Sequence, residues 1–104
     1  MTIKLMLESL SRVINSISIE IPSATWFGFG SFFLGSEHFS DIDLLVTCAN
    51  QREAAQIYEA CFELWSEWPI DLLIMTETEE ASTTFIAKFG CVPLPEGLPS
   101  WRLG

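Results

Sequence analysis

The stretch from residue 26 to residue 46 reads WFGFGSFFLGSEHFSDIDLLV. Its first part is rich in aromatic side chains and favours a β-strand, which the pair Gly30-Ser31 then ends. Its last part begins with Asp41 and Asp43 and then becomes wholly apolar, as a central strand does when both of its faces are covered. The stretch therefore predicts two strands, over residues 25–29 and 41–47, joined through a glycine-rich turn.

The acids of this stretch suggest a metal site. Asp41 and Asp43 are one residue apart, so on a strand their carboxylates point to the same face. Neighbouring carboxylates repel each other, and such a pair is reasonable only in water or around a cation. Asp71, near the start of a strand predicted over residues 70–75, supplies a third acid. Three converging acids predict bound Mg²⁺, which prefers oxygen ligands. The alternative is a solvated strand edge.

The turn at Gly30 and Ser31 leads from the first predicted strand into a short helical turn. Backbone N–H groups at such a place can bind phosphate oxygens, and the Ser31 hydroxyl could add a further bond. A glycine-rich turn by itself is more often only a tight bend. Phe32 and Phe33 beside it could stack on a base, although core packing explains most aromatic residues of a small domain.

Two helices precede and follow this pair of strands. Apolar residues at steps of three and four predict an amphipathic helix over residues 3–17, and residues 18–23 break its pattern. Asn50 and Glu53 form a capping-box pattern at the start of a second helix, predicted over residues 51–67. Both helices are expected to cover the sheet.

The end of the chain predicts one more helix. Thr76 with Glu79 would cap it, and Gly90 fits its C-terminal end. An irregular tail is expected from about residue 91. Residues 1–104 are therefore predicted to form one α/β (α+β) domain, with a small central mixed sheet flanked by helices.

Composition limits the class of protein. Fourteen acidic residues against five basic ones give a net charge of −9, which disfavours broad binding of nucleic acids. No apolar stretch is long enough to cross a membrane, and the first residues lack the order of a signal peptide. Three widely spaced cysteines without a CxxC pair predict reduced thiols. We therefore expect a cytoplasmic protein.

Taken together, these motifs resemble the signature of the nucleotidyltransferase superfamily related to polymerase beta, and in particular its short, stand-alone members, the minimal nucleotidyltransferases. That signature is Gly-Ser, a spacer with a second glycine, Asp-x-Asp opening an apolar strand, and a further Asp on a later strand. The matching residues are Gly30, Ser31, Gly35, Asp41, Asp43 and Asp71.

The resemblance implies transfer of a nucleoside monophosphate from a nucleoside triphosphate to a hydroxyl, with release of pyrophosphate. It implies that Asp41 and Asp43 bind Mg²⁺, two ions with the bound triphosphate, and that Asp71 is a further ligand or the base. Gly30 and Ser31 would contact the terminal phosphates. Members of the family often work with a separately encoded helical protein as a toxin-antitoxin pair. A helical protein partner is therefore expected. Because so short a chain leaves no second domain for an acceptor, the acceptor hydroxyl could belong to that partner. Surplus apolar surface would suit a partner or a second copy of the chain.

The sequence also departs from the family. Leu34 stands where many stand-alone members carry an arginine, and cations are scarce throughout the chain. Arg52 follows the second predicted strand and could approach the phosphates, or could be an ordinary surface residue. His38 could bind metal or phosphate, but a lone loop histidine is more often a bystander. The intact acids favour an enzyme. The alternative is a catalytically weak or inactive module that binds and regulates a protein partner.

Overall fold

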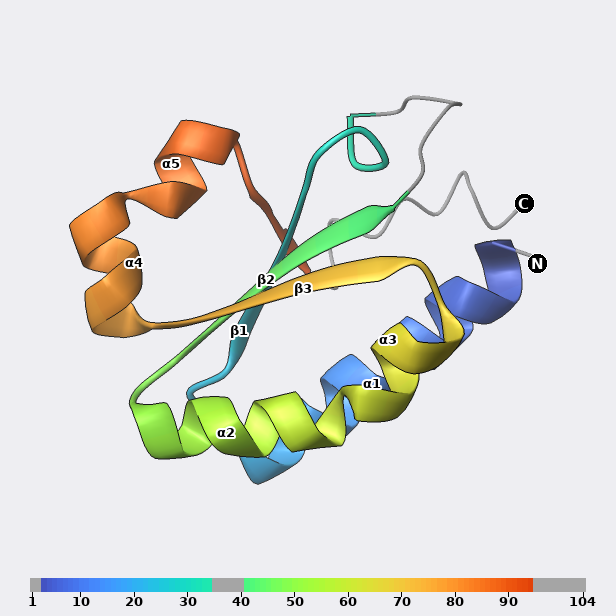
Figure 1. The fold of residues 1–104 in the computed structure, drawn as a ribbon, viewed down its shortest axis with the longest axis horizontal. Coiled ribbons are helices and arrows are strands. Elements are labelled where there is room, and N and C mark those ends of the chain that lie inside the picture. The colour runs from blue at the N-terminus through green and yellow to red at the C-terminus, as the bar shows by residue number, and fades with distance from the viewer. Residues whose placement is uncertain (1–2, 35–40, 95–104) are drawn as a thin grey trace.

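The computed structural model describes residues 3–34 and 41–94. Its centre is a four-stranded mixed sheet in the order β3 (Ile70–Thr76), β2 (Ile42–Cys48), β1 (Thr25–Phe29) and β4 (Val92–Leu94) (Figure 1). Strand β2 pairs antiparallel with β1 and parallel with β3, and β4 pairs antiparallel with β1. This architecture confirms the predicted α/β class. In chain order the elements are α1 (Ile3–Glu20), β1 (Thr25–Phe29), β2 (Ile42–Cys48), α2 (Gln51–Ala60), α3 (Phe62–Glu67), β3 (Ile70–Thr76), α4 (Glu77–Thr83), α5 (Phe85–Phe89) and β4 (Val92–Leu94).

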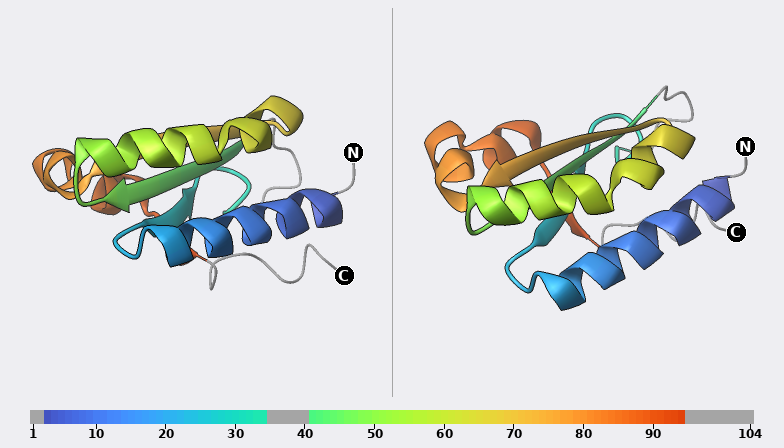
Figure 2. Two further views of the ribbon diagram at one scale, coloured as in Figure 1. Left: turned by 90° about the horizontal axis from the view of Figure 1, so that it is seen from below. Right: turned by 60° about the horizontal axis from the view of Figure 1, so that its bottom comes forward.

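Helix α1 lies beside α2 and α3 on one face of the sheet (Figure 2). The helix is longer than predicted, because Ser18 does not break it. The N–H of Ile21 still donates to the carbonyl of Ile17 at 2.7 Å, and the regular backbone ends only just before Pro22, which has no N–H to donate. Within residues 3–34 and 41–94, no helix combines the length and hydropathy needed to cross a membrane.

The prediction of one helix over residues 51–67 is wrong, because the chain bends at Cys61. Its φ of −94° and ψ of 0° end α2 and begin α3, and no proline or glycine marks the place in the sequence. The start of α2 is closer to the prediction. Asn50 Oδ1 accepts from the N–H of Glu53 at 2.9 Å, whereas the Glu53 carboxylate accepts from Ala49 at 3.0 Å and not from Asn50.

The last predicted helix is also divided in two, at Thr84. Its φ of 50° is left-handed and separates α4 from α5. The capping box is confirmed, since Glu79 Oε1 accepts from the N–H of Thr76 at 2.8 Å and Thr76 Oγ1 accepts from Glu79 at 3.1 Å. Gly90, with a φ of 60°, ends α5 as predicted.

The tail is not wholly irregular as predicted. Residues 92–94 form β4, an edge strand, where Pro93 is tolerated because it need not donate to a further strand. Residues 95–104 lie outside the described part of the chain.

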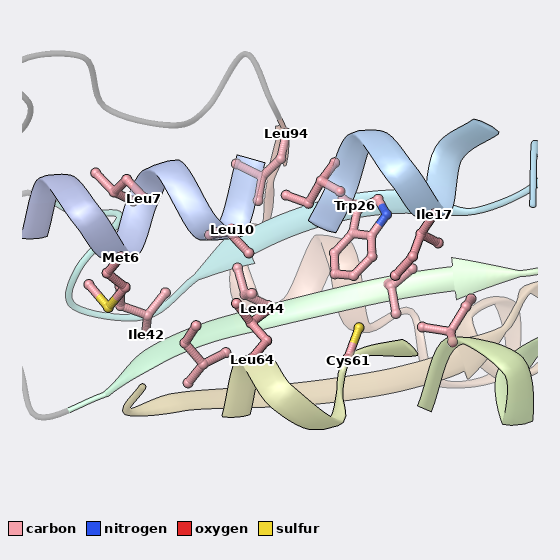
Figure 3. Packing of buried hydrophobic residues seen from close by; sticks show 14 of the residues in the cluster. Met6, Leu7, Leu10, Ile17, Trp26, Ile42, Leu44, Cys61, Leu64 and Leu94 are labelled. Atoms are coloured by element: carbon pink, nitrogen blue, oxygen red, sulfur yellow. The ribbon is translucent and has the colours of Figure 1, made fainter. Parts of the chain in front are cut away.

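The core lies between the sheet and helices α1 to α3. The side chains of strand β2 alternate between the two faces of the sheet. Ile42 and Leu44 (Figure 3) and also Val46 are fully buried in this core, whereas Asp43 and Leu45 point to the opposite face. Leu45 is also fully buried, so both faces of the strand are covered along its middle, as its apolar run predicts. Asp43, the acid of this strand, therefore faces away from the main core.

Candidate functional site

Three strands place one residue each in a row at the same end of the sheet. Phe29 is the register partner of Asp43, and Asp43 is the register partner of Asp71. Neighbouring strands lie about 4.8 Å apart and partners in register point to the same face, so the two carboxylates are neighbours. A cavity of about 320 Å³ opens there. Its described lining residues are Phe29, Asp43, Asp71, Leu72 and Leu73.

The glycine-serine turn touches this row directly. Gly30 has a φ of 80°, and a Cβ atom added to it would overlap Asp43 Oδ2. Glycine is therefore required both by the backbone and by the carboxylate against it. The N–H of Leu34 donates to the carbonyls of Gly30 and Ser31, each at 3.2 Å, which closes a helical turn after β1. Ser31 is exposed at its start. The predicted phosphate turn and the predicted acids thus meet at one place.

Asp41 lies just before β2 and is exposed. Burial raises the pKa of Asp43, and the negative charges of Asp71 and then Asp41 raise it further. The three acids thus act on one another electrostatically. Across residues 3–34 and 41–94, however, no three side chains among His, Cys, Asp and Glu are arranged so that they could hold a metal ion. The structure pairs Asp43 with Asp71 and leaves Asp41 at the margin.

Positive charge is absent from the described lining of the cavity, which holds two carboxylates and apolar side chains. Arg52 follows the C-terminal end of β2, whereas Asp43 lies near its start. The five residue-to-residue steps from Asp43 to Cys48 span about 16 Å of strand. Arg52 is therefore at the other end of the strand. Leu34, at the position of the missing arginine, is 83% exposed. In the part of the chain that the structure describes, no basic side chain lines the cavity beside the acids.

Phe32 and Phe33 pack in or against the main core, which is the alternative that the sequence favoured over base contact. Phe32 is fully buried in the main core, which excludes it from ligand contact. Phe33 is half-buried and its ring covers Gly28, since a Cβ atom there would overlap that ring. Gly35 and His38 lie outside the described residues.

A different aromatic cluster borders the cavity, and sequence reasoning missed it. The Phe29 ring lies 5.1 Å from the ring of Phe85 and 6.0 Å from that of Phe89, measured between centroids. Phe85 and Phe89 are four residues apart, a spacing that puts two side chains on one helix face. That spacing could have predicted that the two rings lie together. Their contact with Phe29, more than fifty positions earlier, could not be predicted from the sequence.

A larger cavity, of about 380 Å³, lies between the C-terminal ends of α1 and α2. Glu20 and Glu59 are its charged lining residues. Its lining residues include no acids paired across neighbouring strands and no glycine turn. The chemistry of the chain therefore points to the smaller cavity on the other face of the sheet.

The four-stranded mixed sheet flanked by helices matches a nucleotidyltransferase fold, as comparison with solved structures shows. A solved structure of "a putative nucleotidyltransferase from Sulfolobus solfataricus" is similar to this chain, with a TM-score of 0.57 over 85% of this chain and 78% of that one. Their sequences are 18% identical, so the likeness concerns the fold alone. No protein-family model matches the chain. No curated protein matches it either.

Proposed function

We propose that this chain is a metal-dependent nucleotidyltransferase that moves a nucleoside monophosphate from a nucleoside triphosphate to a hydroxyl. The observation that carries the proposal is the pairing of Asp43 with Asp71 in register, with the Gly30 backbone against the Asp43 carboxylate. The fold that the chain shares with the Sulfolobus protein supports the same class of reaction. The cavity volume is at the lower end of the range typical of small-molecule sites.

The donor set fits Mg²⁺. This ion commonly takes one or two protein carboxylates and completes its coordination with substrate phosphates and water. Asp43 and Asp71 would hold it. The pKa of Asp43 is raised first by burial and then by the neighbouring acids, which disfavours its charged form while no metal ion is bound. Asp41, beside them, would serve a second ion that arrives with the triphosphate. When bound, the metal stabilises the charge that develops on the attacking and leaving oxygens.

The residues of the chain then have separate roles. The Gly30-Ser31 turn contacts the terminal phosphates through backbone N–H groups and the Ser31 hydroxyl. The acceptor oxygen attacks the α-phosphorus, the bond from that phosphorus to the bridging oxygen breaks, and pyrophosphate leaves. Asp71 is exposed at the cavity and accepts the proton of the attacking hydroxyl. The acceptor that we propose is a hydroxyl of a partner protein.

A second candidate is a module that keeps the fold but binds and regulates a protein partner without catalysis. Two observations favour it. No basic side chain is found among the described residues that line the cavity, and the described acids do not form a three-ligand metal group. Triphosphate binding separates the two candidates, because only the enzyme needs it.

The test is calorimetric titration of ATP with Mg²⁺ into the wild type and into Asp43→Asn/Asp71→Asn. Glu59→Gln is the matched control, since it removes an exposed acid far from the row. The enzyme predicts Mg²⁺-dependent binding in the wild type and the control, and none in the double variant. Absence of binding in the wild type would refute the enzyme and favour the regulatory module. If ATP binds, transfer of label from α-labelled ATP to protein then identifies the acceptor.

A further inference from the structure

The cluster formed by Phe29, Phe85 and Phe89 takes no part in the proposed reaction, although it borders its cavity. Phe29 lines the cavity together with Asp43 and Asp71. Phe85 and Phe89 are stacked on each other, with centroids 4.3 Å apart and planes inclined by 24°. Phe89 is nevertheless 57% exposed. The acids therefore have an aromatic surface beside them that is partly open to solvent.

Helix α5 carries Phe85 and Phe89, and its direction depends on a strained backbone conformation at Thr84. Thr84 has a φ of 50° and a ψ of 40°, a left-handed conformation that is unfavourable for a β-branched residue. Neighbouring bonds hold it there: its N–H donates to the carbonyl of Glu80 at 2.7 Å, and Glu80 Oε2 accepts from Ile86 at 3.0 Å. A helix continuing through Thr84 would carry Phe85 and Phe89 in another direction. Maintained strain of this kind is often found where a ligand is bound.

We propose that Phe89, backed by Phe85, stacks on the base of the nucleotide whose phosphates are held at Asp43 and Asp71. This inference rests on the proposed function. A nucleotide has a charged phosphate end and a flat, uncharged base, and the site offers acids for metal-bound phosphates beside an exposed ring. Stacking on an aromatic ring accepts every base, because every base has a flat π-face. Purines overlap the ring more fully, so purine triphosphates bind more tightly than pyrimidine triphosphates.

Exposure alone does not carry the inference, because single exposed apolar residues are common on protein surfaces. Phe62 is an example: it is 59% exposed and belongs to α3, which packs on the face of the sheet opposite to Asp43. What distinguishes Phe89 is its contact with Phe29, which itself lines the acid cavity. Phe62 therefore provides a matched control of the same residue type and similar exposure.

The experiment compares two probes, Mg²⁺ with inorganic tripolyphosphate and Mg²⁺ with ATP, by calorimetry. The proteins are the wild type, Phe89→Ala, Phe89→Leu and Phe62→Ala. Phe89→Leu keeps an apolar side chain but removes the π-face, so it separates stacking from loss of packing. Thermal unfolding and circular dichroism confirm that each variant is folded. We expect Phe89→Ala to bind ATP about 5- to 100-fold more weakly, as typical losses of base stacking indicate, and to bind tripolyphosphate as the wild type does.

The possible outcomes separate the two proposals. An ATP-specific loss in Phe89→Ala, a smaller loss in Phe89→Leu and no change in Phe62→Ala support base stacking. Wild-type affinity for ATP in Phe89→Ala overturns it and leaves the phosphate site intact. Equal losses for both probes also overturn it, because the ring would then serve the phosphate site or the fold. If the wild type binds neither probe, the proposed function fails and the base site fails with it.

Discussion

Replacing Asp43 by asparagine should stabilise the metal-free protein at neutral pH. Asp43 and Asp71 are register partners on adjacent strands, so their charges lie about 5 Å apart and interact by about 1 kcal/mol in water-like surroundings. Like charges opposite each other on a sheet destabilise by about 0.2–1 kcal/mol, which agrees with this figure. Asparagine removes the repulsion and keeps the shape of the side chain. The free energy of unfolding should therefore rise by about 0.5–1 kcal/mol.

The pH dependence of this gain has a definite sign. Burial and the neighbouring charges raise the pKa of Asp43, so the folded state binds a proton more readily than the unfolded state does. Above its folded pKa the carboxylate is charged and the repulsion is present. As the pH falls through that pKa, the wild type takes up a proton and recovers the stability that the variant has at every pH. The difference between the two proteins should shrink in acid.

Urea denaturation with EDTA, at neutral pH and in mild acid, measures this difference. With a typical slope, a gain of about 1 kcal/mol raises the midpoint by roughly 0.3–1 M urea. When the series is repeated in Mg²⁺, the wild type should become more stable than Asp43→Asn. An ion at ten times its dissociation constant stabilises the wild type by about 1.4 kcal/mol and Asp43→Asn hardly at all. Glu59→Gln should change neither series. A destabilised Asp43→Asn with a pH-independent difference would refute the repulsion, since the carboxylate would then have a favourable partner.

Three further experiments, two substitutions and one labelling reaction, test other parts of the structure. Gly30→Ala should lower the free energy of unfolding by about 1–2 kcal/mol in urea denaturation, because of its positive φ, and should weaken Mg²⁺-dependent ATP binding by displacing the Asp43 carboxylate. Unchanged binding would show that the turn and the acid act separately. Thr84→Gly should raise the midpoint of thermal unfolding by a few degrees, since relief of left-handed strain outweighs the added chain entropy; a lower midpoint would contradict the strain. Burial raises the pKa of Cys61 to about 12, so iodoacetamide at pH 8 should leave that thiol unmodified in the folded protein, and rapid labelling found by peptide mass spectrometry would show that it is accessible.

The sequence predicted the parts of the fold that depend on local pattern. The bounds of β1 follow from an aromatic run that ends at Gly30, and the facing of β2 follows from alternation around Asp43. Period two also assigns Asp43 to the face away from Ile42, which the structure confirms. The capping box at the start of α4 could be predicted because Thr76 and Glu79 form their hydrogen bonds within four residues of chain. Such features require no knowledge of tertiary contacts.

The parts that the sequence could not predict depend on long-range pairing or on backbone angles. Strand β4 forms because residues 92–94 meet the free edge of β1, and no local sequence pattern indicates that pairing. The bends at Cys61 and Thr84 occur without glycine or proline, so the residue types at these positions do not indicate a bend. The sequence predicted that Asp71 lies close to Asp43, but not that the two are register partners, because neither strand by itself determines the register.

The charges of the chain determine how such a site could work. A protein with a net charge of −9 repels a free triphosphate, and the described lining of its cavity adds two carboxylates. The phosphates can approach only with bound cations, so affinity for a nucleotide without metal should be negligible. Uncharged contacts with the base then contribute a larger share of the binding free energy than they do in a site rich in arginine, because these contacts do not depend on the metal. The exposed ring of Phe89 is suited to provide them, and the contrast between ATP and tripolyphosphate measures how the affinity is divided.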